Sequence, residues 1–249
     1  MIKKILITFL TIAAASALML SACSKKKDVL VIATDATWPP MEYVDENKQI
    51  VGFDIDFLNA VAKEGNFKIE FVNTAWDGIF GGLAAGKYDA ICSSVTITEE
   101  RKQTMDFSNP YVAIGQTIIV KKDVEGMDTL DKFEGKKVGA QIGTTGAMEI
   151  AKNKKINLKN YDEIGLAIED LANGRIDAVV CDNPIAANYA LLNPKYKNLL
   201  KIVGTPFTTE EYGVAVKKGN KKVVDMINAG LAKVKEKGID KELEKKWLR

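Results

Sequence analysis

Short apolar segments alternate with amphipathic ones along most of this chain. VLVIAT at residues 29–34 predicts a buried strand, and DIDFLNAVAKEG at residues 54–65 predicts a helix with one apolar stripe that stops at Gly65. Apolar residues on both sides of a polar turn, at 41–45 and 49–53, predict a hairpin. Further strands are expected at 67–72 and 89–94, and further helices at 76–87 and 98–103.

A second run of the same kind follows residue 122. Its apolar segments predict strands at 137–141, 156–161 and 177–182. Its amphipathic segments predict helices at 144–153, 163–174, 183–192, 220–238 and 238–248. Because strands and helices alternate, each run predicts a mostly parallel sheet that is flanked by helices. The expected fold class is therefore α/β.

One short segment occurs twice. LAAGKYDAIC at residues 83–92 returns as LANGRIDAVVC at residues 171–181, with its glycine and its aspartate both displaced by 88 positions. A match this short can arise by chance, because glycine often ends a helix and β-branched residues often follow a turn. Interpreted as a repeat, the segment marks equivalent edges of two lobes of similar build.

Two extended segments, at 111–116 and 210–214, separate the runs. We therefore expect a chain that leaves the first lobe, forms the second and returns. In open parallel sheets, ligands bind beyond the carboxyl ends of the strands. Ser93 and Ser94 follow the first copy of the repeated strand, and Asp182 ends the second. Both strand ends are expected to face one cleft.

The first residues have the features of an export signal rather than of a membrane span. Lys3 and Lys4 precede an apolar run at 5–20, which is shorter than the ~20 residues that a spanning helix needs. LSAC follows and resembles a bacterial lipobox, which would make Cys23 the lipidated first residue of the mature protein. An ordinary signal peptide cut nearby is the alternative. The expected organisation is a lipoprotein signal peptide at 1–22, a lipidated cysteine and tether at 23–27, lobe 1 at 28–111 and 213–249, and lobe 2 at 112–212.

Composition argues against several classes of function. The 249 residues include 35 Lys and Arg and 33 Asp and Glu, and loss of Lys3 and Lys4 with the signal leaves no basic excess to attract nucleic acid. The chain contains no His, which argues against most hydrolases and zinc enzymes. Cys92 and Cys181 each follow an apolar strand in a different half, so we expect two buried thiols. Neither a metal nor another cofactor is expected.

Four segments carry a resemblance to a known family. They lie at 33–63, 86–111, 143–146 and 174–184, and together they resemble the solute-binding proteins of polar amino-acid ABC importers, known as bacterial extracellular solute-binding protein family 3. The resemblance covers roughly residues 29–248 in the family's order. It implies a two-lobed periplasmic-binding-protein fold with a ligand cleft at a two-strand hinge. It also implies a monomeric, extracytoplasmic binding protein that takes a free L-amino acid, is held at a bacterial membrane and delivers its ligand to a membrane permease.

The resemblance also implies contacts with the amino-acid head group. Arg101, taken alone, reads as a solvated helix residue, but the family pairs this arginine with the ligand α-carboxylate, for which a planar guanidinium is well matched. Asp182 ends a buried strand, where a carboxylate needs a partner. In the family that partner is the ligand ammonium, and capping of the next helix is its alternative role. Ser93, Ser94 and Thr96 lie where the family supplies further polar contacts.

GTTG at 143–146 follows a strand and opens a helix, whose free N–H groups can receive an anion. A phosphate loop is the rival interpretation, but no Gly-Lys-Ser/Thr follows, so a ligand carboxylate fits better. We assign that contact to Thr145.

The ligand side chain is expected to lie between aromatic residues and to end at an acid. The family places aromatics at the positions of Trp38 and, often, Trp76, although half-buried core tryptophans are the alternative. Asp35 lies where the family reads the far end of the side chain, and Glu42 can add a second negative charge. Gln141 and Cys181 occupy positions that vary with the ligand, and neither identifies it. The motifs expected to form the mouth of the cleft offer no Lys or Arg except Arg101, which the α-carboxylate already uses. A basic ligand, arginine or lysine, is therefore favoured over glutamine or another neutral polar amino acid.

Two other classes compete with an importer subunit. Some prephenate- or arogenate-type dehydratases resemble this family, and Asp35 or Glu42 could serve as their acid or base. A sensor or adhesin that binds an amino acid without importing it is the third class. The complete set of head-group residues favours a binding protein over an enzyme.

Overall fold

The first lobe is built around a five-stranded sheet. The computed structural model describes residues 29–248, so the expected signal peptide and the lipidation site Cys23 lie outside the described residues. The strand order is β5-β1-β6-β15-β7, with bounds Lys68–Asn73, Val29–Thr34, Ala90–Ile91, Ala215–Lys217 and Met105–Phe107. The helices of this lobe are α2 (Phe53–Gly65), α3 (Trp76–Ala85), α4 (Glu99–Thr104), α8 (Lys221–Glu236) and α9 (Ile239–Trp247). A small sheet joins β2 (Thr37–Trp38), β3 (Glu42–Val44) and β4 (Ile50–Val51), and its β3–β4 pair is the predicted hairpin.

The second lobe repeats the same plan. Its strand order is β11-β10-β12-β9-β13, with bounds Asn157–Tyr161, Lys137–Gln141, Ala178–Asp182, Gln116–Lys121 and Leu200–Val203. Its helical segments are α5 (Thr145–Lys152), α6 (Ile164–Ala172), α7 (Asn183–Ala187), a 3₁₀ turn η1 (Leu130–Phe133) and a π-helical segment η2 (Asn188–Leu192). The predicted helix at 183–192 is thus α7 continued by one wider turn.

Alternation along the strands explains why helices cover both faces of each sheet. In β1, Leu30 and Ile32 share a core with α2 and α8, whereas Val31 and Ala33 lie in a second core with α3. The second lobe follows the same rule, with α5 on one face and α6 and α7 on the other. Successive side chains of a strand point to opposite faces, so a run of apolar residues needs apolar cover on both.

The repeated segment occupies equivalent positions in the two lobes. Each copy forms the strand in the middle of its sheet, β6 or β12. Asp89 N donates to Val31 O and Val31 N donates to Asp89 Oδ2, both at 2.8 Å. Asp177 and Lys137 exchange the same two bonds, again at 2.8 Å. The matched aspartates therefore tie the same strand pair together in both lobes.

One strand in each sheet runs against the others. β9 is antiparallel to β12 and β13, and β15 is antiparallel to β6 and β7. These are the strands by which the chain enters each lobe from the other one, so they start at the cleft edge where the parallel strands end. The sheets are mostly parallel, as predicted. The antiparallel strands β9 and β15 were not predicted from the sequence.

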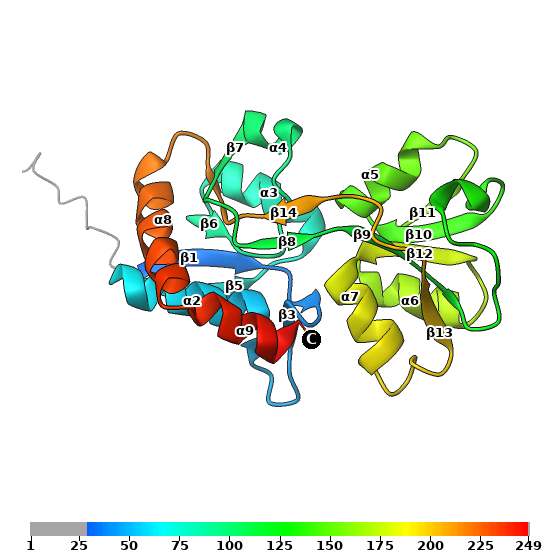
Figure 1. Cartoon of the computed structure of the whole chain (residues 1–249). Coiled ribbons are helices and arrows are strands. Elements are labelled where there is room, and N and C mark those ends of the chain that lie inside the picture. The colour runs from blue at the N-terminus through cyan, green and yellow to red at the C-terminus, as the bar shows by residue number, and fades with distance from the viewer. Residues whose placement is uncertain (1–28, 249) are drawn as a thin grey trace, which may run out of the picture.

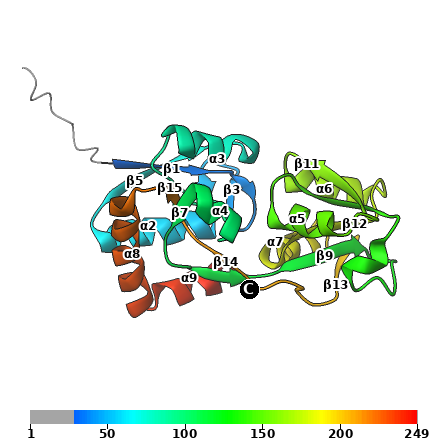
Figure 2. The same ribbon diagram turned by 90° about the horizontal axis from the view of Figure 1, so that it is seen from above.

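Two further strands lie between the lobes. β8 (Val112–Ile114) pairs with β14 (Glu210–Tyr212) in an antiparallel sheet of their own, within the two extended segments of the sequence (Figure 1). Figure 2 shows α8 and α9 on the first lobe, beside α2. The two-lobed α/β fold predicted from the sequence is confirmed. Within residues 29–248 no helix combines the length and the apolar character that a membrane crossing requires.

Candidate ligand-binding site

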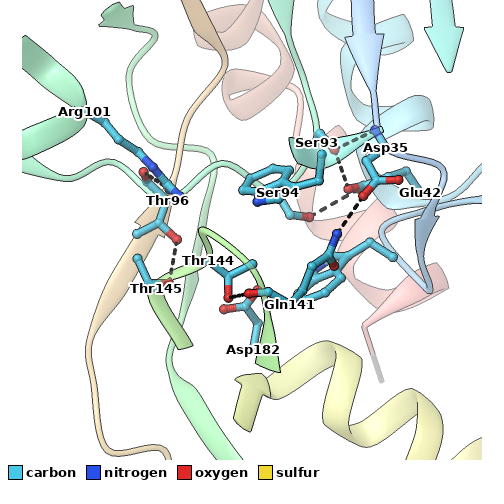
Figure 3. A pocket seen from close by; sticks show the side chains of 12 residues that line it. Asp35, Glu42, Ser93, Ser94, Thr96, Arg101, Gln141, Thr144, Thr145 and Asp182 are labelled. Atoms are coloured by element: carbon cyan, nitrogen blue, oxygen red, sulfur yellow. Dashed lines mark hydrogen bonds between the residues drawn. The ribbon is translucent and has the colours of Figure 1, made fainter. Parts of the chain in front are cut away.

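A cavity lies between the lobes (Figure 3). It is lined by Asp35, Trp38, Glu42, Trp76, Ser93, Ser94, Thr96, Arg101, Gln141, Thr144, Thr145 and Asp182. All ten residues that the sequence predicts as ligand contacts are among them, and Glu42 and Thr144 complete the set. Sequence analysis did not predict Thr144 as a cavity residue, because both threonines of GTTG lie at the start of the helix and nothing in the local sequence separates their roles.

The ends of parallel strands bring these residues together. In the first lobe, Asp35 directly follows β1, and Ser93 lies two residues beyond the end of β6. In the second lobe, Gln141 ends β10 and Asp182 ends β12. Since β1 and β6, and likewise β10 and β12, are parallel neighbours, their carboxyl ends share one edge of each sheet, and both edges face the cavity.

The lobes touch across the cavity. Gln141 Nε2 in the second lobe donates to Asp35 Oδ2 in the first at 2.9 Å (Figure 3). Arg101 Nη2 in the first lobe donates to the Gly143 carbonyl of the second at 3.1 Å. The structure is therefore a closed arrangement of the two lobes.

Arg101 is a buried cation held in a fixed orientation. The backbone N–H of Arg101 donates to the Thr98 hydroxyl at 3.1 Å, which caps α4 as the sequence predicts. Its Nη1 donates to the Thr96 carbonyl at 2.9 Å, and its guanidinium carbon lies 5.2 Å from the centre of the Phe80 ring. Burial lowers the pKa of Arg101, while the nearby Asp182 carboxylate opposes that effect. A guanidinium group is planar and always charged, so in this position it suits a carboxylate partner.

Asp182 is a buried acidic group whose charge acts on Arg101. It stands at the N-cap position of α7, but its side chain makes no capping hydrogen bond. Gln116, its register partner on β9, donates from Nε2 to Asp182 Oδ1. Burial raises the pKa of Asp182 to about 6, so a cation at this point would favour the ionised form. Gln116 escaped sequence analysis because only strand pairing places it here.

Asp35 and Glu42 form the acidic end of the cavity. Asp35 Oδ1 accepts from the Thr37 hydroxyl at 2.9 Å, and burial raises the pKa of Asp35. Ser93 Oγ accepts from Asp35 N and donates to Glu42 Oε1, both at 2.9 Å (Figure 3). Burial, and then the charge of Asp54, raise the pKa of Glu42 well above its ordinary value. Ser93 thus joins the two acids.

Asp54 lies behind this acidic end, at the start of α2. Its Oδ2 accepts from Ser94 N at 2.6 Å and from the Tyr111 hydroxyl at 2.9 Å. Ser94 has a φ of 51°, in the left-handed region, and the bond to Asp54 holds it there. Burial raises the pKa of Asp54 to about 6. Sequence analysis did not single out Asp54, because an acid beside the apolar stripe of a helix looks the same in sequence whether it is buried or exposed.

Trp38 and Trp76 form apolar walls of the cavity and are themselves buried. Trp76 lies edge-on to Phe80, with ring centres 4.9 Å apart, and the Arg101 guanidinium carbon is 5.7 Å from the Trp76 ring centre. Both tryptophans also belong to the hydrophobic cores. They therefore line the cavity and pack in the cores at the same time.

The start of α5 presents a helix N-terminus to the cavity. Thr144 Oγ1 caps the helix by accepting from Ala147 N at 3.3 Å, and it donates to the Gln141 carbonyl at 2.7 Å. Thr145 is the first helical residue, and the first N–H groups of a helix have no partner within the helix. Its hydroxyl is already engaged with Gln116 and Glu210, so an anion would meet the backbone N–H of Thr145 instead.

The remaining cysteines lie outside the cavity lining. Cys92 and Cys181 are both free and buried, as predicted, and burial raises the pKa of each thiol well above its ordinary value. Among residues 29–248, no cluster of three or more Cys, Asp and Glu side chains is arranged to hold a metal ion.

Comparison with known proteins places the chain in a family. The model of the bacterial extracellular solute-binding proteins, family 3, matches residues 30–249. The chain belongs to this family. Among family members, a probable histidine-binding protein of Neisseria gonorrhoeae is 42% identical over 241 residues, which cover 90% of this chain and 89% of the relative. The resemblance inferred from the four sequence segments is confirmed.

Solved structures of family 3 relatives share the fold. An ancestral arginine-binding protein bound to arginine matches with a TM-score of 0.84 and 41% identity, covering 90% of this chain and 99% of its own. The same kind of protein bound to glutamine also matches with a TM-score of 0.84 at 41% identity, over 89% and 98% of the two chains. An ancestral amino-acid-binding protein, a precursor of cyclohexadienyl dehydratase, matches with a TM-score of 0.83 and 37% identity, over 90% and 97%.

Proposed function

We propose that this protein is the extracytoplasmic amino-acid-binding component of an ABC importer and that its ligand is a basic L-amino acid, arginine or lysine. The charge of the cavity lining carries the proposal. Three acidic side chains, Asp35, Glu42 and Asp182, surround the space, and among residues 29–248 Arg101 is the one cation that lines it. A ligand with two positive groups and one negative group complements this set, whereas an acidic side chain would meet like charges.

The proposed pose assigns one group of the ligand to each charged end. The α-carboxylate pairs with Arg101 and the Thr145 N–H, with polar support from Ser94 and Thr96. The α-ammonium pairs with Asp182, whose pKa is raised to about 6 by burial. A cation beside this carboxyl favours its ionised form. The side chain passes between Trp38 and Trp76.

The far end of the side chain then reaches Asp35, with Ser93 and Glu42 behind it. Gln141 Nε2 donates to Asp35 Oδ2, and its buried Oε1 has no hydrogen-bond partner among residues 29–248. A guanidinium or ammonium that arrived here would supply a donor to that orphaned oxygen. Relatives named as arginine-binding and histidine-binding support a basic ligand.

Glutamine is the runner-up ligand. An ancestral arginine-binding relative accepts it, and an amide can donate to Asp35 while it accepts from Gln141. A dehydratase is a weaker candidate, favoured by the relative that preceded such an enzyme. We propose a binding protein rather than an enzyme because the head-group residues and the acidic end together account for all the charges that line the cavity.

The location of the protein is part of the proposal. The family is extracellular, and we infer that export is followed by lipidation at Cys23, which would tether a monomer to a bacterial membrane beside its permease. Metabolic labelling with a palmitate analogue, compared between wild type and Cys23→Ala, tests the anchor. Label in the variant would refute it.

A thermal-shift screen of the twenty L-amino acids and their D-isomers tests the ligand. Free ligand at ~100 times its dissociation constant adds about 2.7 kcal/mol to the stability, which is readily detected. Arginine or lysine should give the largest shift. A shift by glutamine alone would move the assignment to the runner-up, and one by glutamate or aspartate would refute the charge argument. Silence across the panel would favour the dehydratase or another ligand class.

A matched pair of variants sharpens this screen. Asp35→Asn removes the charge at the far end of the proposed pose, while Asp123→Asn removes an exposed acid of the second lobe. Asp35→Asn should lose the preference for arginine over glutamine, and Asp123→Asn should keep it. Equal preference in both variants would remove Asp35 from the pose.

A further inference from the structure

Glu210 lies at the point where the two lobes and the hinge strands meet. It opens β14 and is the register partner of Ile114 on β8. It does not line the cavity, but it shares a separate outer groove with Thr96 and Thr145, which also line the cavity. Its carboxylate therefore stands behind these two threonines, on the side away from the ligand space.

One carboxylate oxygen of Glu210 accepts from both lobes. The Thr96 hydroxyl of the first lobe donates to Glu210 Oε2 at 3.0 Å, and the Thr145 hydroxyl of the second donates to the same atom at 2.7 Å. The two threonine oxygens are 3.4 Å apart. Glu210 Oε1 accepts from Thr208 Oγ1 at 2.7 Å, which keeps the carboxylate oriented.

The hydrogen bond between Thr145 and Glu210 also sets the direction of a series of hydrogen bonds that ends at Asp182. A hydroxyl has one hydrogen, so when Thr145 donates it to Glu210, its lone pairs face other donors. Gln116 Nε2 supplies one, at 3.0 Å from Thr145 Oγ1, and the same amide nitrogen donates to Asp182 Oδ1. These hydrogen bonds therefore run from Glu210 in the hinge to Asp182, the residue proposed to bind the ammonium of the amino acid.

Opening of the cleft must break this arrangement. Thr96 and Thr145 belong to opposite lobes, so rotation about β8 and β14 separates them, and a single oxygen of Glu210 cannot follow both. Hydrogen bonds to a carboxylate are roughly twice as strong as neutral ones. Apparent affinity scales with the fraction of protein that is competent to bind, so a contact present only in the closed form alters affinity without touching the ligand.

We propose that Glu210 is a closure residue, which joins the Thr96 and Thr145 hydroxyls in the closed form and slows release of the bound amino acid. The part concerning release rests on the proposed function. The part concerning closure does not, because it concerns hydrogen bonds between residues of this chain alone.

Glu210→Gln tests the proposal, with Glu211→Gln as the matched control. Glu211 is the next residue of β14, is exposed, and loses the same charge on substitution. With full-length protein and L-arginine, Glu210→Gln should raise the dissociation rate constant about tenfold and leave the association rate constant near wild type, as loss of one charge-assisted bond implies. Glu211→Gln should change neither rate.

A ligand-free measurement separates this role from the proposed function. Hydrogen–deuterium exchange at segments 94–97 and 143–148 should be faster in Glu210→Gln than in wild type and Glu211→Gln, while the melting temperature stays unchanged. Equal exchange in all three proteins would overturn the closure role, as would a loss of melting temperature in Glu210→Gln that accounts for the faster exchange. If wild type bound no amino acid, the proposed function would fall, and the exchange result would still decide the role of Glu210.

Discussion

Asp182→Asn separates the cost of burying a charge from the benefit of binding with it. Burial raises the pKa of Asp182 from 3.8 to about 6, a shift of two units or so, and each unit corresponds to about 1.36 kcal/mol. A carboxyl whose pKa is higher in the folded state keeps its proton while the unfolded chain loses it. Between pH 4 and 6 the folded state therefore binds more protons, and stability falls as pH rises.

The asparagine variant escapes this loss because it does not titrate. It keeps an oxygen for the Gln116 amide, and no helix-capping bond is lost, since Asp182 makes none. The stability of Asp182→Asn relative to wild type should therefore rise by roughly 2 kcal/mol between pH 4 and pH 7. Other titrating groups cancel in this difference, because both proteins contain them.

Ligand binding should respond in the opposite direction. The proposed ammonium contact needs the ionised carboxylate, so wild-type affinity should weaken as pH falls through about 6. At pH 7, Asp182→Asn should bind ~2–5 kcal/mol more weakly than wild type, as expected when one partner of a buried charge pair is removed. The variant's own affinity should vary much less with pH over this range.

Urea unfolding and titration calorimetry at pH 4.5, 6 and 7.5 measure both quantities, with Glu211→Gln as an exposed carboxylate control. A stability difference between Asp182→Asn and wild type that stayed flat with pH would refute the reasoning on burial. Unchanged affinity at pH 7 would remove Asp182 from the proposed pose.

Three further outcomes are expected. Arg101→Ala should fold but bind its amino acid ~2–5 kcal/mol more weakly by calorimetry, because the ligand carboxylate would be buried unpaired, and near wild-type affinity would contradict the head-group assignment. Saturating ligand should reduce the radius of gyration in small-angle scattering as the lobes rotate about the segments at 111–116 and 210–214, and an unchanged radius would count against hinge closure. Gly52→Ala should destabilise the protein by about 1–3 kcal/mol or more in urea unfolding, because Gly52 has a φ of 137° and an added Cβ would lie 2.2 Å from the Met41 carbonyl oxygen; wild-type stability would show that the backbone relaxes there.

Local pattern was enough to predict the α-helices and the strands β1, β5, β6, β10, β11 and β12, but not β7, β9, β13 and β15. The resemblance to the family supplied most of the cavity residues. Apolar runs and amphipathic periods identified the strands and helices because each depends on neighbours within a few residues. The expected convergence of Ser93 and Asp182 followed from their places at the ends of parallel strands, where ligands bind, whereas Asp35 and Gln141 were expected from the resemblance. The roles of these residues in binding are predictions for the variants above to test.

Tertiary structure decided which distant residues became partners. Gln116 meets Asp182 only because β9 runs antiparallel to β12, and Glu210 meets Thr96 and Thr145 only because both lobes close on the hinge strands.

The burial of Glu42 and Asp54 was decided in the same way. The two acids share their surroundings with Ser94, which lies at least 40 positions away from either in the chain. Pairing, burial and raised pKa values arise from segments that are brought together by packing, and a pattern that extends over one helical turn or one strand carries no record of them.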